Sequence, residues 1–236
     1  AIDFLVDHKL TAVRVVFNCN GQGQSDYVSP QQSAEALAGK LEAFGCDVMV
    51  IDGHNWEQVF EALTATAEEK PLVIVAKTVK GWGVKELQQH TYHGKPLKAE
   101  QVTQAEADLD AVAAELGVAK LDDIAGLQVE TPASVSRPTG GPLSAGEFAE
   151  AMSAAGLGSA LESRKLATRR AYGAALAALG ADARVVALDA DVKNSTFANL
   201  FADRHPDRFY ECRIAEQNMI SAAAGLSASG RIPFVS

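Results

Sequence analysis

The chain has 236 residues, of which 47% are apolar and 22% are charged, and its formal net charge is −9. These proportions are typical of a folded globular chain and exclude an intrinsically disordered one. The negative charge argues against a bulk affinity for nucleic acid or an anionic membrane surface, and no apolar run reaches the roughly 20 residues that span a bilayer.

The first half of the chain alternates the patterns of strands and helices. Apolar and β-branched side chains predict strands at residues 13–17, 48–51 and 72–76. A helical pattern follows each of the first two strands, and a longer one covers residues 99–116. Short links between alternating strands and helices predict a parallel sheet with right-handed crossovers, which is an α/β fold.

The first two helices have recognisable ends. Pro30 can open the first helix, which we expect to end at Gly45. Asn55, followed by Gln58, makes a capping-box-like start for the second. Apolar residues at helical spacing predict the buried faces, which are Leu37, Leu41 and Phe44 in the first helix and Trp56, Phe60 and Leu63 in the second.

The composition changes in the middle of the chain. Residues 131–142 are rich in proline, glycine and hydroxyl side chains, which predicts a linker and a boundary between two α/β parts. The chain opens at Ala1 within a helix-like apolar pattern and stops at Ser236 directly after a strand-like run. We therefore expect both ends to continue in a longer protein.

The second half restarts the α/β pattern. Thr168 is expected to cap a helix that ends at Gly180, and an alanine-rich helix is predicted from Glu216 to Ala228. The buried face of the first of these helices is predicted to be Tyr172, Leu176 and Leu179. Strands are predicted at residues 185–188, 209–212 and 232–235.

The three cysteines are widely spaced, at Cys19, Cys46 and Cys212. They form neither a zinc-ligand spacing nor a disulfide framework, and they are typical of a reducing compartment. We therefore expect a cytoplasmic location.

Two cationic segments stand out in this acidic chain. Residues 77–98 hold five lysines and one acid, and residues 163–170 hold four cations and no acid. Each segment is therefore +4, which leaves −17 for the rest of the chain. Cations concentrated in this way suggest defined sites for anionic ligands, although two solvated surface patches would have the same composition.

Candidate site residues follow the predicted strands, because ligands of open parallel sheets bind beyond the carboxyl ends of the strands. Asn side chains and turn carbonyls in Asn18–Gln24 are ligands suited to Mg²⁺ or Ca²⁺. In Lys77–Gly83 and at His93, a lysine and a histidine can hold phosphate. Asp189–Thr196 combines acids with hydroxyl and amide groups. Ordinary turns and solvated loops would show the same residues, so spacing alone leaves both interpretations open.

Glu216 stands at the start of a predicted helix, where a carboxylate favours the helix dipole. That would be a purely structural role. Its alanine-rich neighbours predict partial burial, and a buried carboxylate can share a proton with a ligand.

At these segments the chain resembles the transketolase family, and most closely its animal-type branch. The matching runs occur in family order and are NGQGQSD at 20–26, LEAFGCDVMVIDGH at 41–54, AKTVKGWG at 76–83, HGKPL at 93–97, ATRRAY at 167–172, DADVKNSTF at 189–197, and the run from 205 to 234 that contains CRIAEQNM. The resemblance covers nearly the whole chain except the linker.

The resemblance implies a thiamine diphosphate-binding α/β fold, with parallel sheets and helices on both faces. Residues 1–116 would be the C-terminal part of the diphosphate-binding domain, and residues 167–236 the N-terminal part of the pyrimidine-binding domain. Residues 117–166 would be the linker between these two partial domains.

The implied activity is transfer of a two-carbon ketol unit from a ketose phosphate to an aldose phosphate, as in the pentose phosphate pathway and in Calvin-type sugar interconversion. It uses thiamine diphosphate and a divalent metal, Mg²⁺ or Ca²⁺. The family resemblance also implies a homodimer with the active site at its interface.

The resemblance assigns roles to individual residues. Asn20 would bind the metal through its side chain and touch the cofactor, and Gln22 would offer its backbone carbonyl to the metal. Glu216 matches the catalytic glutamate, which holds a pyrimidine nitrogen so that the cofactor can become a nucleophile. The other cofactor-contacting positions are Gln24, Lys80, His93 and Asp191. The positions that match substrate contacts are His93, which is also a candidate catalytic residue, Arg169 and Ser195.

The chain also departs from the family pattern. The Gly-Asp-Gly metal motif would precede the matched region, and the aromatic residue that stacks on the pyrimidine would follow Ser236. We therefore expect the 236-residue chain to be inactive alone.

Three other interpretations stay open. A non-catalytic transketolase-like fragment would only bind a partner. A 2-oxo acid dehydrogenase E1 component is disfavoured by the phosphate-gripping Arg169 and Ser195. A plain nucleotide-binding module is disfavoured because no G-x-G-x-x-G run follows a strand.

Overall fold

The computed structural model describes residues 1–118, 137–144 and 146–236. The chain divides into two compact units, Ile2–Thr131 and Pro132–Ser236, which we call the N-terminal unit and the C-terminal unit. Each unit contains a three-stranded parallel sheet with helices on both faces, which confirms the predicted α/β class. In the predicted linker at 131–142, residues 131–136 lie outside the described part. Within the described ranges, no helix is long and apolar enough to cross a membrane.

The sheet of the N-terminal unit has the strand order β1-β3-β2, and all its pairings are parallel. Its strands are β1 (Val15–Cys19), β2 (Asp47–Asp52) and β3 (Leu72–Lys77). The central strand β3 is buried from Leu72 to Ala76, which explains its unbroken apolar sequence. Because the strands run parallel, their carboxyl ends lie along one edge of the sheet.

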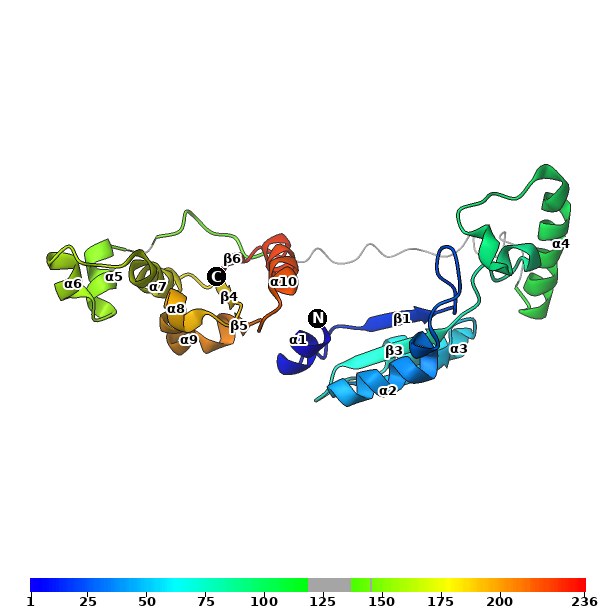
Figure 1. Ribbon diagram of the computed structural model, residues 1–236, viewed down its shortest axis with the longest axis horizontal. Helices are drawn as coiled ribbons and strands as arrows, with labels where there is room; N and C mark the ends of the chain where they lie inside the picture. The colour runs from blue at the N-terminus through cyan, green and yellow to red at the C-terminus, as the bar shows by residue number, and fades with distance from the viewer. Residues whose placement is uncertain (119–136, 145) are drawn as a thin grey trace. The chain divides into compact units, whose positions relative to one another are not determined.

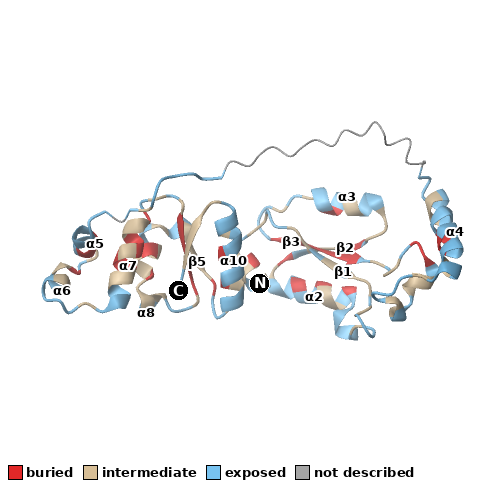
Figure 2. Ribbon diagram, turned by 90° about the horizontal axis from the view of Figure 1, so that it is seen from above, coloured by how far each residue is buried: buried red, intermediate tan, exposed pale blue. Residues whose placement is uncertain are grey.

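Helices cover both faces of this sheet (Figure 2). Residues of α1 (Ile2–Asp7) and α2 (Ala34–Phe44) pack with Val73 and Val75 on one face. On the other face, Ala62 of α3 (Trp56–Thr64) packs with Ile74. In the described part of the unit, the remaining elements are the 3₁₀ turns η1 (Pro30–Gln32), η2 (Lys85–Gln88) and η3 (His90–Tyr92), and α4 (Ala99–Glu115).

The first predicted helix begins later than its proline suggested. Pro30 opens the 3₁₀ turn η1, and Ser33 caps α2 by accepting a hydrogen bond from the Ala36 amide at 3.2 Å. The predicted end at Gly45 is confirmed. The predicted face is partly wrong, because Phe44 is 47% exposed whereas Ala34, Ala38 and Leu41 are buried. The small side chains of Ala34 and Ala38 let α2 approach the sheet closely. Phe44 is the last residue of the helix and stays partly exposed.

The cap of α3 is confirmed in part. The Asn55 side chain accepts a hydrogen bond from the Gln58 amide at 3.0 Å, but the Gln58 side chain accepts from the Asp52 amide at 2.8 Å and not from Asn55. The predicted buried face is wrong, because the helix contacts the sheet through Val59 and Ala62. The three side chains expected there are largely exposed, at 77% for Trp56, 58% for Phe60 and 54% for Leu63.

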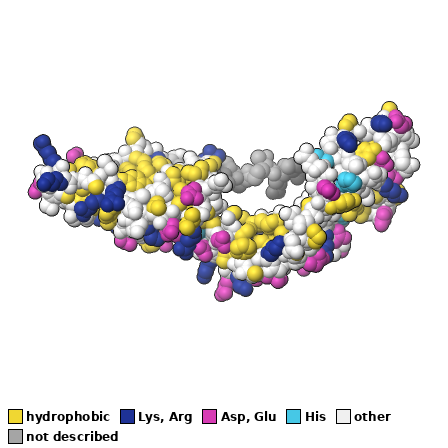
Figure 3. Space-filling view, in the orientation of Figure 1, with side chains coloured by type: hydrophobic (Ala, Val, Ile, Leu, Met, Phe, Trp, Pro, Cys, Tyr) yellow, Lys and Arg dark blue, Asp and Glu magenta, His cyan; other side chains and the backbone are white. Residues whose placement is uncertain are grey.

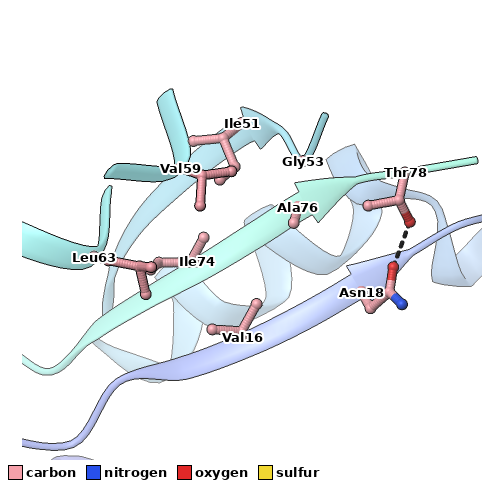
Figure 4. A pocket seen from close by; sticks show the side chains of 9 residues that line it. All are labelled: Val16, Asn18, Ile51, Gly53, Val59, Leu63, Ile74, Ala76 and Thr78. Atoms are coloured by element: carbon pink, nitrogen blue, oxygen red, sulfur yellow. Dashed lines mark hydrogen bonds between the residues drawn. The ribbon is translucent and has the colours of Figure 1, made fainter. Parts of the chain in front are cut away.

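An apolar pocket of about 320 Å³ lies between α3 and the sheet (Figure 4). Val16 of β1 and Ile74 of β3 form its floor, and Val59 and Leu63 line it from α3. Val16 is 52% exposed. Apolar side chains of α3 and of the sheet therefore face the same open pocket. Leu63 can lie on the apolar side of the helix and still be exposed.

The sheet of the C-terminal unit has the strand order β5-β4-β6, again all parallel. Its strands are β4 (Val185–Asp189), β5 (Phe209–Glu211) and β6 (Ile232–Val235). On one face, α7 (Thr168–Leu179) and α9 (Asn199–Arg204) pack on Val185 and Ala187 through Leu176 and Phe201. α10 (Glu216–Ala228) packs on the other face (Figure 2), and the unit also contains α8 (Lys193–Thr196) and η5 (Pro206–Arg208). The bounds of α10 and β6 agree with the predicted ones.

Two short helices within residues 117–166 were missed by the sequence analysis. They are α5 (Phe148–Ala154) and α6 (Gly158–Glu162). Met152 and Leu157 are buried together with Ala174 of α7. Thr168, expected as a cap, is instead the first helical residue of α7 and its side chain caps nothing. The helix starts one residue earlier than predicted, with Ala167 at its N-cap position.

The C-terminal unit also holds the residues just before α5. The Arg184 guanidinium donates a 2.7 Å hydrogen bond to the Gly141 carbonyl and forms a 2.6 Å ion pair with Asp182. Pro138 approaches Gly230 so closely that a Cβ on this glycine would lie 2.9 Å from the Pro138 ring. The segment 137–144 is therefore fixed to the unit.

Candidate functional site

The carboxyl ends of β1, β2 and β3 bring three loops of the N-terminal unit together. The Thr78 hydroxyl donates a hydrogen bond to the Asn18 side chain, which links the ends of β3 and β1. The Gly53 amide donates to the Lys77 carbonyl at 2.8 Å, which links β2 to β3. The two candidate segments Asn18–Gln24 and Lys77–Gly83 are thus neighbours in space, as their positions after strands predicted.

The loop after β1 folds into a small hairpin that stands out from the sheet edge (Figure 1). Two backbone bonds close it, from the Gly23 amide to Asp26 at 2.8 Å and from the Val28 amide to Gly21 at 3.0 Å. The Gln22 carbonyl takes no part in these bonds. The Asn20 side-chain oxygen accepts a hydrogen bond from the Gln22 amide at 2.9 Å, so the Asn20 side chain and the Gln22 backbone are adjacent in the loop.

Oxygen donors of this kind fit a divalent cation such as Mg²⁺, which also keeps water and phosphate oxygens among its ligands. The Asn20 side-chain oxygen and the Gln22 carbonyl would be its protein ligands. Within the described ranges, no group of three or more His, Cys, Asp or Glu side chains is placed to hold a metal.

Lys80 connects the loop after β3 to this hairpin. Its ammonium donates a 2.8 Å hydrogen bond to the Gly23 carbonyl, and the side chain is half-buried. The Gln22 amide group adds a second connection, a 2.8 Å bond to the Gln88 carbonyl. A positive charge therefore lies beside the oxygen-rich loop, which is where a metal-bound diphosphate would require it. Gln24 lies in the same hairpin and is exposed.

His93 follows η3 and is exposed. The preceding residue is anchored by a polar network, in which the Tyr92 hydroxyl bonds to the Glu86 carboxylate at 2.5 Å and to the Gln101 amide at 2.7 Å. The ring of His90 lies 5.1 Å from that of Tyr27 in the hairpin. The loop that carries His93 is therefore adjacent to the hairpin, but the His93 side chain itself is not fixed by these contacts.

In the C-terminal unit, polar groups gather where β4 and β5 end. The Asp189 carboxylate is fully buried and accepts from the Val192 amide at 2.7 Å. Burial raises the pKa of Asp189 above its usual range, although the bonds to the Val192 amide and the Thr196 hydroxyl act in the opposite direction. The predicted residue Asp191 is exposed, and its amide donates to the Glu211 carboxylate at 3.1 Å.

Glu211 organises this loop and was not predicted as a site residue. It also accepts from the Lys193 ammonium at 2.9 Å and from the Arg213 amide at 3.1 Å. Burial alone would raise the pKa of Glu211, but the bonds from Lys193 and the two amides outweigh burial and lower it. Its position at the end of β5 is the signal that could have identified it.

Arg169 lies near the Phe197 ring, and Ser195 is two residues before Phe197 in the sequence. The Arg169 and Arg170 guanidinium carbons each lie 5.7 Å from the centre of the Phe197 ring. Ser195 is exposed two residues before Phe197, at the end of the turn formed by α8. Cationic side chains gather over α6 and α7 (Figure 3), which agrees with a site for an anion.

Glu216 is the first residue of α10, as predicted, but it is exposed and not partly buried. Its neighbours Ile214 and Ile220 are also exposed, at 80% and 55%. The buried residues of α10 are Met219 and Ala223, whereas Glu216 in the first turn is exposed. Within the described part of this unit, no surface covers it.

The fold and these two sets of residues define the class of protein as an α/β chain with the thiamine diphosphate-binding fold. A family model described as "Transketolase, thiamine diphosphate binding domain" matches residues 9–118, and one described as "Transketolase, pyrimidine binding domain" matches residues 164–236. Together they cover more than three quarters of the chain. The chain belongs to the transketolase family.

Curated relatives agree with the animal-type branch. The chain is 37% identical over 243 residues to the transketolase of Mus musculus, with all of the chain and 36% of the relative covered. It is 35% identical over 240 residues to transketolase-like protein 2 of Bos taurus, with the same coverage. The chain thus spans little more than a third of the length of these relatives.

Solved structures show the same fold. The transketolase of Campylobacter jejuni matches with a TM-score of 0.62 and 20% identity, over 99% of this chain and 39% of that one. A transketolase of Pichia stipitis, solved in complex with sedoheptulose-7-phosphate, matches with a TM-score of 0.59 and 15% identity, over 99% and 40%.

Proposed function

We propose that this chain carries cofactor- and substrate-binding residues of a transketolase, which moves a two-carbon ketol unit from a ketose phosphate to an aldose phosphate. The observation that carries the proposal is the 2.8 Å bond from Lys80 to the Gly23 carbonyl, which brings a cation onto the oxygen-lined loop of Asn20 and Gln22. A diphosphate bound with a divalent metal requires this pairing of a cation and oxygen ligands.

The chain's own residues would each bind or orient a defined part of the ligands. Asn20 and Gln22 would bind Mg²⁺ or Ca²⁺, and Lys80 would neutralise the diphosphate. Gln24, His93 and Asp191 would make further contacts with the cofactor. When bound, thiamine diphosphate supplies the acidic carbon and the electron sink that ketol transfer requires.

Glu216 would accept a hydrogen bond at the pyrimidine ring and favour the tautomer that takes up a proton. Its place in the first turn of α10 orients the carboxylate, but solvent exposure would weaken such a hydrogen bond. We therefore propose that the isolated chain does not catalyse ketol transfer, and that a second copy covers Glu216 in a homodimer. The exposed Ile214 and Ile220 beside it support such an interface.

Arg169 and Ser195 would hold the substrate phosphate, and His93 would contact the sugar. The sedoheptulose-7-phosphate complex of the Pichia stipitis protein supports a sugar phosphate as the substrate class. Arg169 suits this role, because a guanidinium can bind a phosphate with two parallel hydrogen bonds.

We also propose that residues 1–116 and 167–236 belong to the diphosphate-binding and pyrimidine-binding domains, with residues 117–166 joining them. The family models support this division, since one ends at residue 118 and the other begins at residue 164. The free thiols of Cys19, Cys46 and Cys212 are consistent with a cytoplasmic location.

Calorimetric titration with thiamine diphosphate, in Mg²⁺ and again in EDTA, tests the proposal. Lys80→Met should weaken binding about 10- to 150-fold, the range expected for losing a charge-assisted hydrogen bond. Lys95→Met is the matched control, since Lys95 is an exposed lysine of the same cationic segment. If the wild-type chain binds no cofactor, the result favours a non-catalytic transketolase-like fragment.

An activity assay on the same chain distinguishes a transketolase from a 2-oxo acid dehydrogenase component. Turnover of ketose phosphates by this chain would refute its proposed inactivity and still favour a transketolase, whereas decarboxylation of 2-oxo acids would favour a 2-oxo acid dehydrogenase component. This comparison requires the homodimer, so the oligomeric state is measured first by light scattering.

A further inference from the structure

His54, which follows β2, contacts the Lys80 loop on both sides of the lysine. Its Nε2 accepts a 2.8 Å hydrogen bond from the Val79 amide. Its ring stacks on the Trp82 indole, with 4.5 Å between centroids and 11° between planes.

The local backbone makes this contact possible. Gly53 lies directly against the end of β3, where a Cβ would be 2.5 Å from the Thr78 methyl group and 3.2 Å from the Lys77 carbonyl. A residue with a side chain would push the two loops apart. The His54 amide also donates to the Asp52 carboxylate at 2.9 Å, which fixes the turn from which the ring projects.

The hydrogen bond defines the state of the ring. Because the Val79 amide donates, Nε2 has to be the unprotonated nitrogen, and the proton of the neutral imidazole is on Nδ1. The backbone from Val79 to Trp82 is then held at one end by a hydrogen bond and at the other by a stacked ring. Lys80 lies between these two points, and its ammonium reaches Gly23 in the hairpin.

We propose that His54 is a positioning residue, which holds the Val79–Trp82 backbone so that Lys80 reaches the cofactor loop. His54 touches neither cofactor nor substrate in this assignment and acts only through Lys80. The proposal rests on the proposed function, because it takes the ligand of Lys80 to be a diphosphate.

The test compares two substitutions in the full chain. His54→Gln keeps an acceptor oxygen as many bonds from the main chain as Nε2, whereas His54→Leu has a similar size and no acceptor. The first measurement is amide hydrogen exchange of residues 79–83 by mass spectrometry without ligand. The second is calorimetric affinity for thiamine diphosphate in Mg²⁺.

We expect His54→Leu to speed exchange in residues 79–83 by about 3- to 10-fold, the effect of losing one net hydrogen bond, and to weaken affinity by a similar factor. His54→Gln keeps the hydrogen bond but not the ring stacked on Trp82, so it should recover most but not all of both effects. If His54 only supported folding, His54→Leu would speed amide exchange throughout β2 and β3. His54→Gln would then not slow exchange specifically in residues 79–83.

Two results would overturn the proposal. One is equal exchange in the wild type and His54→Leu, and the other is faster exchange with unchanged affinity. If the wild type binds no thiamine diphosphate, the proposed function fails, and the exchange measurement still decides whether His54 holds the loop.

Discussion

Gly173 of α7 gives a sharp prediction, because the helix and the Phe197 turn touch at this glycine. A Cβ at Gly173 would lie 2.4 Å from the Phe197 carbonyl oxygen and 2.5 Å from its Cβ. At Gly225 of α10, a Cβ would meet nothing within 4 Å. Both glycines are helical, so the substitutions Gly173→Ala and Gly225→Ala form a pair in which only the buried Gly173 has such a contact.

The expected free energies have opposite signs. Replacing a helical glycine by alanine stabilises a helix by about 0.5–1 kcal/mol. Gly225→Ala should show this gain. Gly173→Ala has the same gain but must displace the Phe197 backbone, and overpacking costs about 1–3 kcal/mol. We expect a net loss of stability at Gly173, and a difference between the two variants of about 1–3 kcal/mol.

Urea unfolding followed by far-UV circular dichroism measures this difference. Tryptophan fluorescence serves as an internal control, because Trp56 and Trp82 are the only tryptophans of the chain and both lie in the N-terminal unit. The fluorescence transition should be the same in both variants. If Gly173→Ala proves as stable as Gly225→Ala, the close contact with Phe197 does not exist in solution.

Three further predictions concern other parts of the chain. Gly81→Ala should destabilise more than Gly94→Ala in calorimetric melting, because both glycines have positive φ but only the first would drive a Cβ into the η2 backbone, 2.3 Å away. The Arg184 guanidinium lowers the pKa of Asp182 to about 2, so Asp182→Asn should destabilise the chain at pH 7. Because a lowered pKa stabilises the folded state above the unfolded value, this difference should shrink as the pH falls from about 4 towards 2, and pH-dependent urea unfolding checks it. Phe60→Ser should change stability by less than about 1 kcal/mol and reduce binding of a hydrophobic dye, since Phe60 is 58% exposed.

Local signals in the sequence were sufficient for much of the fold. The alanine-rich run and the strand after it define α10 and β6 to the residue, because a polar start and a glycine-containing turn mark their ends. Asn55 was recognisable as a cap because its side chain bonds within the next turn. These are contacts between residues close in sequence, which spacing can predict.

Burial was harder to predict, because it depends on partners distant in sequence. The periodicity of Trp56, Phe60 and Leu63 is that of an apolar face, yet the sheet contacts the helix through Ala62. The helices α5 and α6 form around Met152 and Leu157, which become buried only against α7. Glu216 has apolar neighbours in sequence, but it is exposed in the described part of its unit.

The candidate site follows the same rule. Loops that follow parallel strands were predicted to meet, and the bonds of Lys80 and Gln22 to neighbouring loops are consistent with this. The role of His54 could not be predicted, because its hydrogen bond and its stacked ring both involve a loop 25 residues away or more.

The anchoring of residues 137–144 has a practical consequence for cutting the chain. A fragment that began at residue 164, where the pyrimidine-domain match starts, would lose Met152, which is fully buried, and would leave Ala174 facing water. A fragment that began at residue 137 would keep the Arg184–Gly141 bond and both short helices. The smallest piece of this unit that can be expected to behave as one folded body in expression trials or limited proteolysis therefore starts well before the region that sequence similarity marks.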